Sequence, residues 1–202
     1  MGLSKDMFRN MSFDERRLTD PRVMRALAHP TRIQLMELVA REGELTATAA
    51  ADALGLSPAN CSFHLRQLGK YGFLEEAAHG PGRTRPWRIG SVRHSWEEVG
   101  PDAEATAAAS ALTSVVLERD LDRLRDWLAR QPSAEPRWRK AAFLSEALLY
   151  LTPEELDSLG EAFVELVQPY VERVAPERRP EGSAPVQVLA AGFPIRPTAT
   201  GN

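Results

Sequence analysis

Residues 46–74 read TATAAADALGLSPANCSFHLRQLGKYGFL, and this stretch decides the fold. Its first part is an alanine-rich helical pattern that stops at Gly55, whose missing Cβ suits the left-handed conformation just after a helix. A single residue then separates this glycine from Ser57-Pro58, a helix cap followed by proline at the first helical position. The second helical pattern ends at Gly72. Two helices joined by so tight a turn predict a helix-turn-helix.

The flanking sequence extends this unit on both sides. Asp20-Pro21 begins one short helix, and a second runs from Pro30 to Gly43. After the helix-turn-helix, Phe73-Leu74 begins a strand, residues 80–82 (Gly-Pro-Gly) form a turn, and residues 87–89 alternate as a returning strand. A hairpin placed directly after the second helix of the motif is a wing, so the sequence predicts a winged helix-turn-helix.

Two stretches carry a family resemblance. Residues 27–32 (LAHPTR) and 57–74 (SPANCSFHLRQLGKYGFL) resemble the winged-helix repressors of the ArsR type, over roughly residues 20–90. The resemblance implies a dimeric bacterial transcription regulator. Metal-sensing members carry a Cys-x-Cys type motif on their third helix, whereas residues 46–54 contain neither cysteine nor histidine. The resemblance therefore favours DNA binding and argues against metal sensing.

We expect an α+β chain that is mainly helical and has three parts. Residues 1–18 form an N-terminal arm, either loose or a helix docked on a partner. Residues 19–91 form the winged helix-turn-helix DNA-binding domain. Residues 92–202 contain a long dimerisation helix and a small C-terminal α/β unit, with a possible effector function.

The recognition helix is expected over residues 58–71. Residues placed about 100° apart put Cys61, Leu65 and Leu68 on a face directed at the core. The remaining surface offers Asn and Gln for adenine edges and Arg for guanine or phosphate. Phe63 could pack on a thymine methyl or on the neighbouring helix. The resemblance implies that His64 packs and reaches the backbone, which favours structural support over base reading. The expected DNA-binding residues here are Ser57, Pro58, Ala59, Asn60, Ser62, Phe63, His64, Arg66, Gln67 and Lys70.

The wing, residues 75–89, interleaves arginines with Pro81, Thr84 and Trp87. We expect Arg83 and Arg85 to contact the DNA backbone or the minor groove. A hairpin that is merely solvated is the alternative.

A long helix is predicted from residue 101 to residue 131, because apolar residues recur at helical spacing without an internal proline or glycine. Its apolar stripe is wide, so we expect a second subunit to cover it, with packing against downstream segments as the alternative. The expected dimerisation residues are Leu112, Val116, Leu121, Leu124 and Leu128.

Further along, residues 143–151 could form a strand or a helix, and we favour a strand. Thr152-Pro153-Glu154-Glu155 caps a helix that runs to about Val174, and residues 186–193 read as a last strand that could pair with the first.

Composition bounds the other function classes. Residues 1–91 hold 13 Lys and Arg against 10 Asp and Glu, while residues 92–202 hold 12 against 18, so a polyanion would bind the first half. A single cysteine, Cys61, excludes an internal disulfide and a site of several thiolates. The four histidines show no metal-ligand spacing, so we expect neither a metal nor a cofactor.

No apolar run approaches the roughly 20 residues of a membrane span, and we expect a cytoplasmic location.

Our leading hypothesis is a sequence-specific transcription regulator that binds double-stranded DNA as a homodimer. The alternative is a winged-helix protein-interaction module without specific DNA binding. An enzyme is not expected, because the chain after the wing is too short for a cofactor-binding fold and lacks its glycine fingerprint. Trp96, Trp127, Trp138, Phe143 and Tyr150 could line a pocket for a small-molecule effector, although ordinary core and interface packing explains them more simply.

Overall fold

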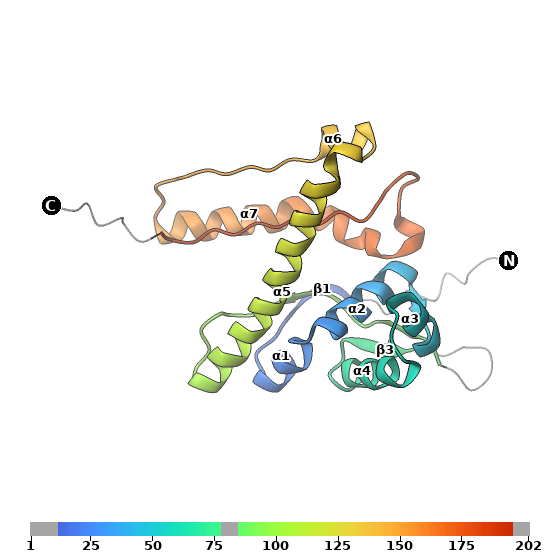
Figure 1. Cartoon of the computed structure of the whole chain (residues 1–202). Coiled ribbons are helices and arrows are strands. Elements are labelled where there is room, and N and C mark those ends of the chain that lie inside the picture. Colours follow the sequence, from blue (N-terminus) through green and yellow to red (C-terminus); the bar gives the residue numbers. More distant parts are fainter. Residues whose placement is uncertain (1–11, 78–84, 196–202) are drawn as a thin grey trace. The chain divides into compact units, whose positions relative to one another are not determined.

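The computed structural model describes residues 12–77 and 85–195 (Figure 1). They divide into two compact units. The first comprises residues up to Asp122 together with Tyr170–Ser183, and the second comprises Arg123–Pro169 together with the chain from Ala184 onward. The units therefore part within the long helix, not between residues 91 and 92 as expected.

The four helices predicted in the first unit are present: α1 (Pro21–Leu27), α2 (Pro30–Glu42), α3 (Ala47–Leu54) and α4 (Pro58–Lys70). Each begins with a side chain that accepts a hydrogen bond from a backbone N–H of the first turn, which satisfies a donor that the helix itself leaves free. These capping residues are Asp20, His29, Thr46 and Ser57. Gly55 ends α3 with φ of 66°, in the left-handed region that its sequence predicts.

The wing strands are also present, as β3 (Leu74–Glu76) and β4 (Trp87–Ile89). They pair antiparallel, and β4 also pairs with β2 (Glu44–Leu45), which gives the order β2-β4-β3. The predicted turn at residues 80–82 and Arg83 lie outside the described residues.

The N-terminal arm differs from both expectations where it is described. Residues Ser12–Arg17 form strand β1, which pairs in parallel with β5 (Ser91–Ser95). The backbone N–H of Leu18 extends this pairing by donating to Ser95 O at 2.7 Å, and the Leu18 side chain is buried. Hydrogen bonding to β5 thus makes this segment part of the folded unit and neither a loose arm nor a helix.

The core of the first unit joins the helix-turn-helix to the long helix. Leu35 of α2, Leu65 of α4 and Phe73 are fully buried in it, and so is Cys61, as its position on the inner face of α4 predicts. The same cluster includes Leu112 of α5 (Ala103–Arg130). The N-terminal half of α5 therefore packs against its own chain.

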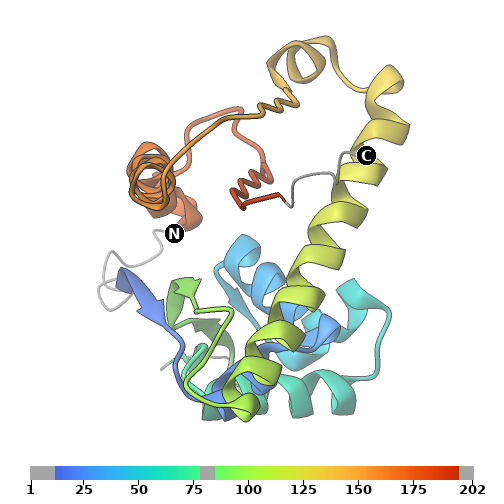
Figure 2. The same cartoon turned by 90° about the vertical axis from the view of Figure 1, so that its left-hand side faces the viewer.

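Figure 2 shows α5 as one continuous helix, coloured green to yellow. Its length agrees with the sequence prediction, but the proposed dimer stripe needs correction. Leu112 is 0% exposed and is covered within the chain, while Val116 is half-buried and packs against the same core. Leu128, by contrast, is 48% exposed.

The second unit contains α6 (Pro136–Ala141) and most of α7 (Pro153–Val171). Thr152 and Glu155 form the predicted cap: Thr152 Oγ1 accepts from Glu155 N at 3.2 Å, and Glu155 Oε2 accepts from Thr152 N at 2.8 Å. The described residues also include short 3-10 helices at Gln131–Ser133, Glu172–Val174 and Pro176–Arg178.

The two C-terminal strands were predicted wrongly. Residues 143–151 and 186–193 are extended without a ladder, and every described strand of the chain lies before residue 96. A strand needs a neighbouring backbone for its N–H and C=O groups, and neither segment finds one. The chain at Gly192 instead runs beside α7, where an added Cβ would lie 2.8 Å from Leu156 Cδ1. The chain is thus mainly helical α+β as expected, but the small C-terminal unit is helical and not α/β.

Candidate nucleic-acid interface

Helix α4 presents the face that the sequence assigns to DNA. Ala59, Phe63, Arg66 and Lys70 are exposed along it, and Phe63 is 49% exposed. Arg66 donates to Ser62 Oγ at 3.1 Å, which orients both side chains. Asn60 is exposed beside this face, and Gln67 is half-buried. These side chains offer amide and guanidinium groups at helical spacing, as base-edge contacts require.

The N-terminus of α4 is exposed as well. Ser57, Pro58 and Ala59 all lie at the surface, and Ser57 Oγ accepts from Asn60 N at 3.2 Å. The backbone dipoles of a helix favour negative charge at this end. This terminus can therefore receive a phosphate oxygen.

His64 lies beneath the exposed face and not on it. It is 7% exposed, and its ring lies tilted by 44° against the ring of His29, the cap of α2, with the ring centres 4.6 Å apart. Arg32 Nε donates to His64 Nδ1 at 3.4 Å. Burial, with smaller contributions from neighbouring groups, lowers the pKa of both histidines and so disfavours their protonation. His64, included among the expected DNA-binding residues, is thus a packing residue that joins α4 to α2.

Cys61 occupies the same inner surface. Its side chain is fully buried, and burial raises the pKa of its thiol. A thiol in such surroundings is a poor nucleophile and a poor ligand.

The described wing arginines are held by carboxylates. Arg85 is exposed and pairs with Glu76 at 2.9 Å, while the less exposed Arg88 pairs with Glu75 at 3.2 Å. Arg85 can exchange this exposed partner for a phosphate at small cost, because exposed ion pairs are weak.

A contact that the sequence does not reveal joins the wing to α4. Trp87 of β4 lies against Gly69, so closely that a Cβ on this glycine would lie 2.4 Å from Trp87 Cζ3 and 2.8 Å from Cη2. Glycine at this position lets the indole ring contact the helix backbone. Strand β4 of the wing is thereby packed directly against α4.

This contact predicts that Gly69→Ala destabilises the protein, although alanine normally stabilises a helix relative to glycine. The new methyl group overlaps the indole ring, and such overpacking should lower the free energy of unfolding by about 1–3 kcal/mol. Gly160→Ala in α7 is the matched control, because nothing lies within 4 Å of its added Cβ. Urea unfolding followed by circular dichroism compares the two. Equal gains in stability for both variants would show that Trp87 does not constrain Gly69.

Other site types find little support in the described chain. Across residues 12–77 and 85–195, no three His, Cys, Asp or Glu side chains are grouped so that they could hold a metal ion. Phe143 is 83% exposed and Tyr150 is 97% exposed, so neither lines a pocket for an effector. Trp96 donates to Thr113 Oγ1 at 2.8 Å and packs beside the core. None of the helices in this part of the chain is long and apolar enough to cross a membrane.

Comparison with known proteins agrees with this geometry. A family described as "Helix-turn-helix domain" matches residues 27–77, from the last residue of α1 through the whole of α2, α3, α4 and β3. The arsenic resistance transcriptional regulator ArsR1 of Pseudomonas putida is 43% identical over 63 residues, which are 31% of this chain. The match spans 49% of that relative's length. Residues 27–77 thus form a helix-turn-helix domain that resembles the one in ArsR-type transcriptional regulators.

Proposed function

We propose that the chain is a sequence-specific, DNA-binding transcription regulator that acts as a homodimer. The observation that carries the proposal is the exposed, donor-rich face of α4 within a domain that resembles those of transcriptional regulators. The family match points to regulation and not to catalysis.

In this proposal α4 enters the major groove. Asn60 and Gln67 bond base edges, and Arg66 bonds guanine or a phosphate. Lys70 and the exposed terminus at Ser57 contact phosphates, which fix the orientation of the helix. The wing, through Arg83 and Arg85, contacts the backbone or the minor groove beside it.

The homodimer is proposed to form through the C-terminal half of α5. Leu121 and Leu124 are half-buried and Leu128 is exposed, and they fall within about 60° of one another around the helix. Leu112 and Val116 leave the proposed interface, because Leu112 is fully buried in the chain's own core and Val116 packs against that core.

The relative is named for arsenic resistance, but α3 of this chain carries no thiolate or imidazole. Any effector of this regulator is therefore proposed to be something other than a metal or arsenic species bound by cysteines of α3.

Selection of bound sequences from a random duplex pool tests the proposed function. A homodimer of winged helices should enrich a palindrome whose half-sites lie one helical turn or a multiple apart, about 34–36 Å per turn. Failure to enrich any sequence, in a pool where the protein is recovered folded, would favour the protein-interaction module instead.

A further inference from the structure

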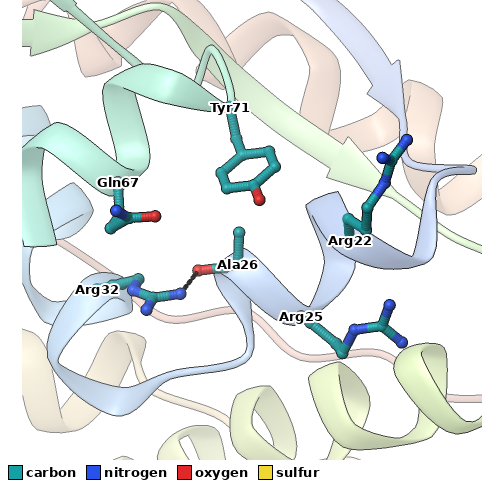
Figure 3. Close-up of a pocket in the computed structure, with 6 residues that line it drawn as sticks. All are labelled: Arg22, Arg25, Ala26, Arg32, Gln67 and Tyr71. Atoms are coloured by element: carbon teal, nitrogen blue, oxygen red, sulfur yellow. Dashed lines mark hydrogen bonds between the residues drawn. The ribbon is translucent and has the colours of Figure 1, made fainter.

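A polar cavity of about 250 Å³ lies beside the C-terminal half of α4. Figure 3 shows the Tyr71 hydroxyl and the Gln67 amide directed into the space between α4 and α1. All of its lining belongs to the first unit. The lining residues are Arg22, Arg25 and Ala26 of α1, Arg32 of α2, Gln67 of α4, and Tyr71, which follows α4.

The cavity is rich in hydrogen-bond donors with positive charge. Arg22 pairs with Asp20 at 3.1 Å, and Arg25 pairs with Glu104 at 2.6 Å. Both arginines are exposed, and exposed ion pairs exchange partners readily.

The third guanidinium is bound differently. Arg32 donates to Ala26 O at 2.5 Å and to His64 Nδ1 at 3.4 Å, and no carboxylate pairs with it among the described residues. The cavity therefore keeps one positive charge that no carboxylate offsets. Lys70 Nζ adds another cation 5.4 Å from the centre of the Tyr71 ring.

The position of the cavity relative to α4 indicates its ligand. Around the helix axis, the exposed face centred on Phe63 has Gly69 on one side and Gln67 with Tyr71 on the other. Gly69 holds Trp87 and thereby the wing, so the wing and the cavity flank the exposed face on opposite sides. A helix in the major groove likewise has a phosphate backbone on each side, across a groove about 12 Å wide.

We propose that this cavity binds a phosphate group of the DNA backbone, on the side of the recognition helix opposite the wing. Arg22 and Arg25 release their carboxylates and bind the phosphate oxygens, and the Tyr71 hydroxyl completes the donor set, while Gln67 at the rim of the cavity keeps its amide for a base edge. The proposal rests on the proposed function, because it takes α4 to be the helix in the groove. A free phosphate ligand has the same chemistry, and the experiment below separates the two sources.

The test uses the full chain with the double substitution Arg22→Ala, Arg25→Ala. Both side chains are exposed, so the fold should persist. Losing one phosphate contact per subunit should make the plot of log affinity against log salt shallower by about two units. Between 50 and 200 mM salt, wild type should then lose about tenfold more affinity than the variant, on selected and random duplexes alike.

The control is Arg41→Ala, Arg173→Ala. It removes the same two charges from side chains that do not line the cavity: Arg41 lies near the other end of α2 from Arg32, and Arg173 stacks on Tyr170. This control should keep the wild-type salt slope. A second arm titrates wild type and the cavity variant with inorganic phosphate by calorimetry at constant ionic strength, without DNA.

The outcomes separate the possibilities. A shallower slope for the cavity variant alone, without saturable phosphate binding, supports the DNA contact. An unchanged slope overturns it, and saturable phosphate binding that the variant loses would then assign the cavity to a free phosphate ligand. Wild type that binds no duplex overturns the proposed function, and with it the DNA source of the phosphate, whatever the variant does.

Discussion

Replacing Leu121 and Leu124 of α5 with glutamate should convert the proposed homodimer to a monomer and reduce its affinity for a two-half-site duplex by about 10²–10⁴-fold. Two carboxylates cannot be buried unpaired at an apolar contact. Once the subunits separate, each binds its half-site alone, and the advantage of linked binding is lost. Sedimentation velocity measures the mass, and fluorescence anisotropy measures the affinity.

Arg130→Glu is the control for this experiment. It changes the charge of the chain by the same two units, on the opposite side of α5 from Leu121. Arg130 pairs only with the exposed Asp126 among the salt bridges of the described residues, so the dimer should persist. An unchanged dimer mass for the double leucine variant, with the winged helix still folded, would contradict an interface in this half of α5.

Acid should destabilise the protein through His94, and His94→Phe should remove this contribution. His94 of β5 packs against Phe73 with ring centres 5.1 Å apart, and its Nε2 meets no hydrogen-bond partner among the described residues. Burial, with a smaller contribution from Arg16, lowers its pKa from 6.5 to about 4. The unfolded chain therefore takes up a proton at a higher pH than the folded chain, and stability falls as the pH drops from about 6.5 towards 4.

The expected loss from this one group is about 2 kcal/mol between pH 7 and pH 5 and about 3 kcal/mol once the pH is below 4. Urea unfolding of wild type and His94→Phe across this range measures it, because subtracting the two curves removes the titration of all other groups. The phenylalanine ring suits the apolar site and leaves no unpaired nitrogen. Parallel stability curves for the two proteins would show that His94 does not titrate as its burial requires.

Local rules made the helix-turn-helix predictable. Ser57-Pro58 and Gly55 set helix ends through caps and the left-handed conformation, which depend on neighbouring residues alone. The core face of α4 followed from the spacing of Cys61, Leu65 and Leu68, and all three are fully buried. The same spacing could not reveal that the His64 ring packs against the His29 ring, because that contact joins α4 to the cap of another helix.

Features that depend on distant segments were not predictable in this way. Strand β1 has the polar sequence SFDERR and pairs with β5 almost 80 residues later, so no alternation of apolar residues marks it. The apolar runs at 143–151 and 186–193 suggested strands, yet a short apolar run does not specify a pairing partner. The row of apolar residues along α5 indicated that this face of the helix is covered. It could not indicate that the chain's own core covers Leu112.

The sequence predicts only the part of the candidate site that depends on one element. The exposed face of α4 follows from the residue spacing along that helix alone. The cavity instead combines arginines of α1 and α2 with Gln67 and Tyr71, and the Gly69 contact requires Trp87 from the wing. These arrangements arise from packing between elements, so a single sequence contains no periodic signal for them.

The central claim is tested most directly by the ratio of affinities for the selected duplex and for a scrambled duplex of the same composition. The ratio is measured for wild type and for the single variants Asn60→Ala and Gln67→Ala. Wild type should prefer the selected duplex by at least about 10³-fold. Each substitution should cost about 1–3 kcal/mol on the selected duplex and leave binding to the scrambled duplex nearly unchanged, because base contacts specify while phosphate contacts position. Equal affinities of wild type for the two duplexes, or a variant that keeps the full preference, would contradict base reading by α4.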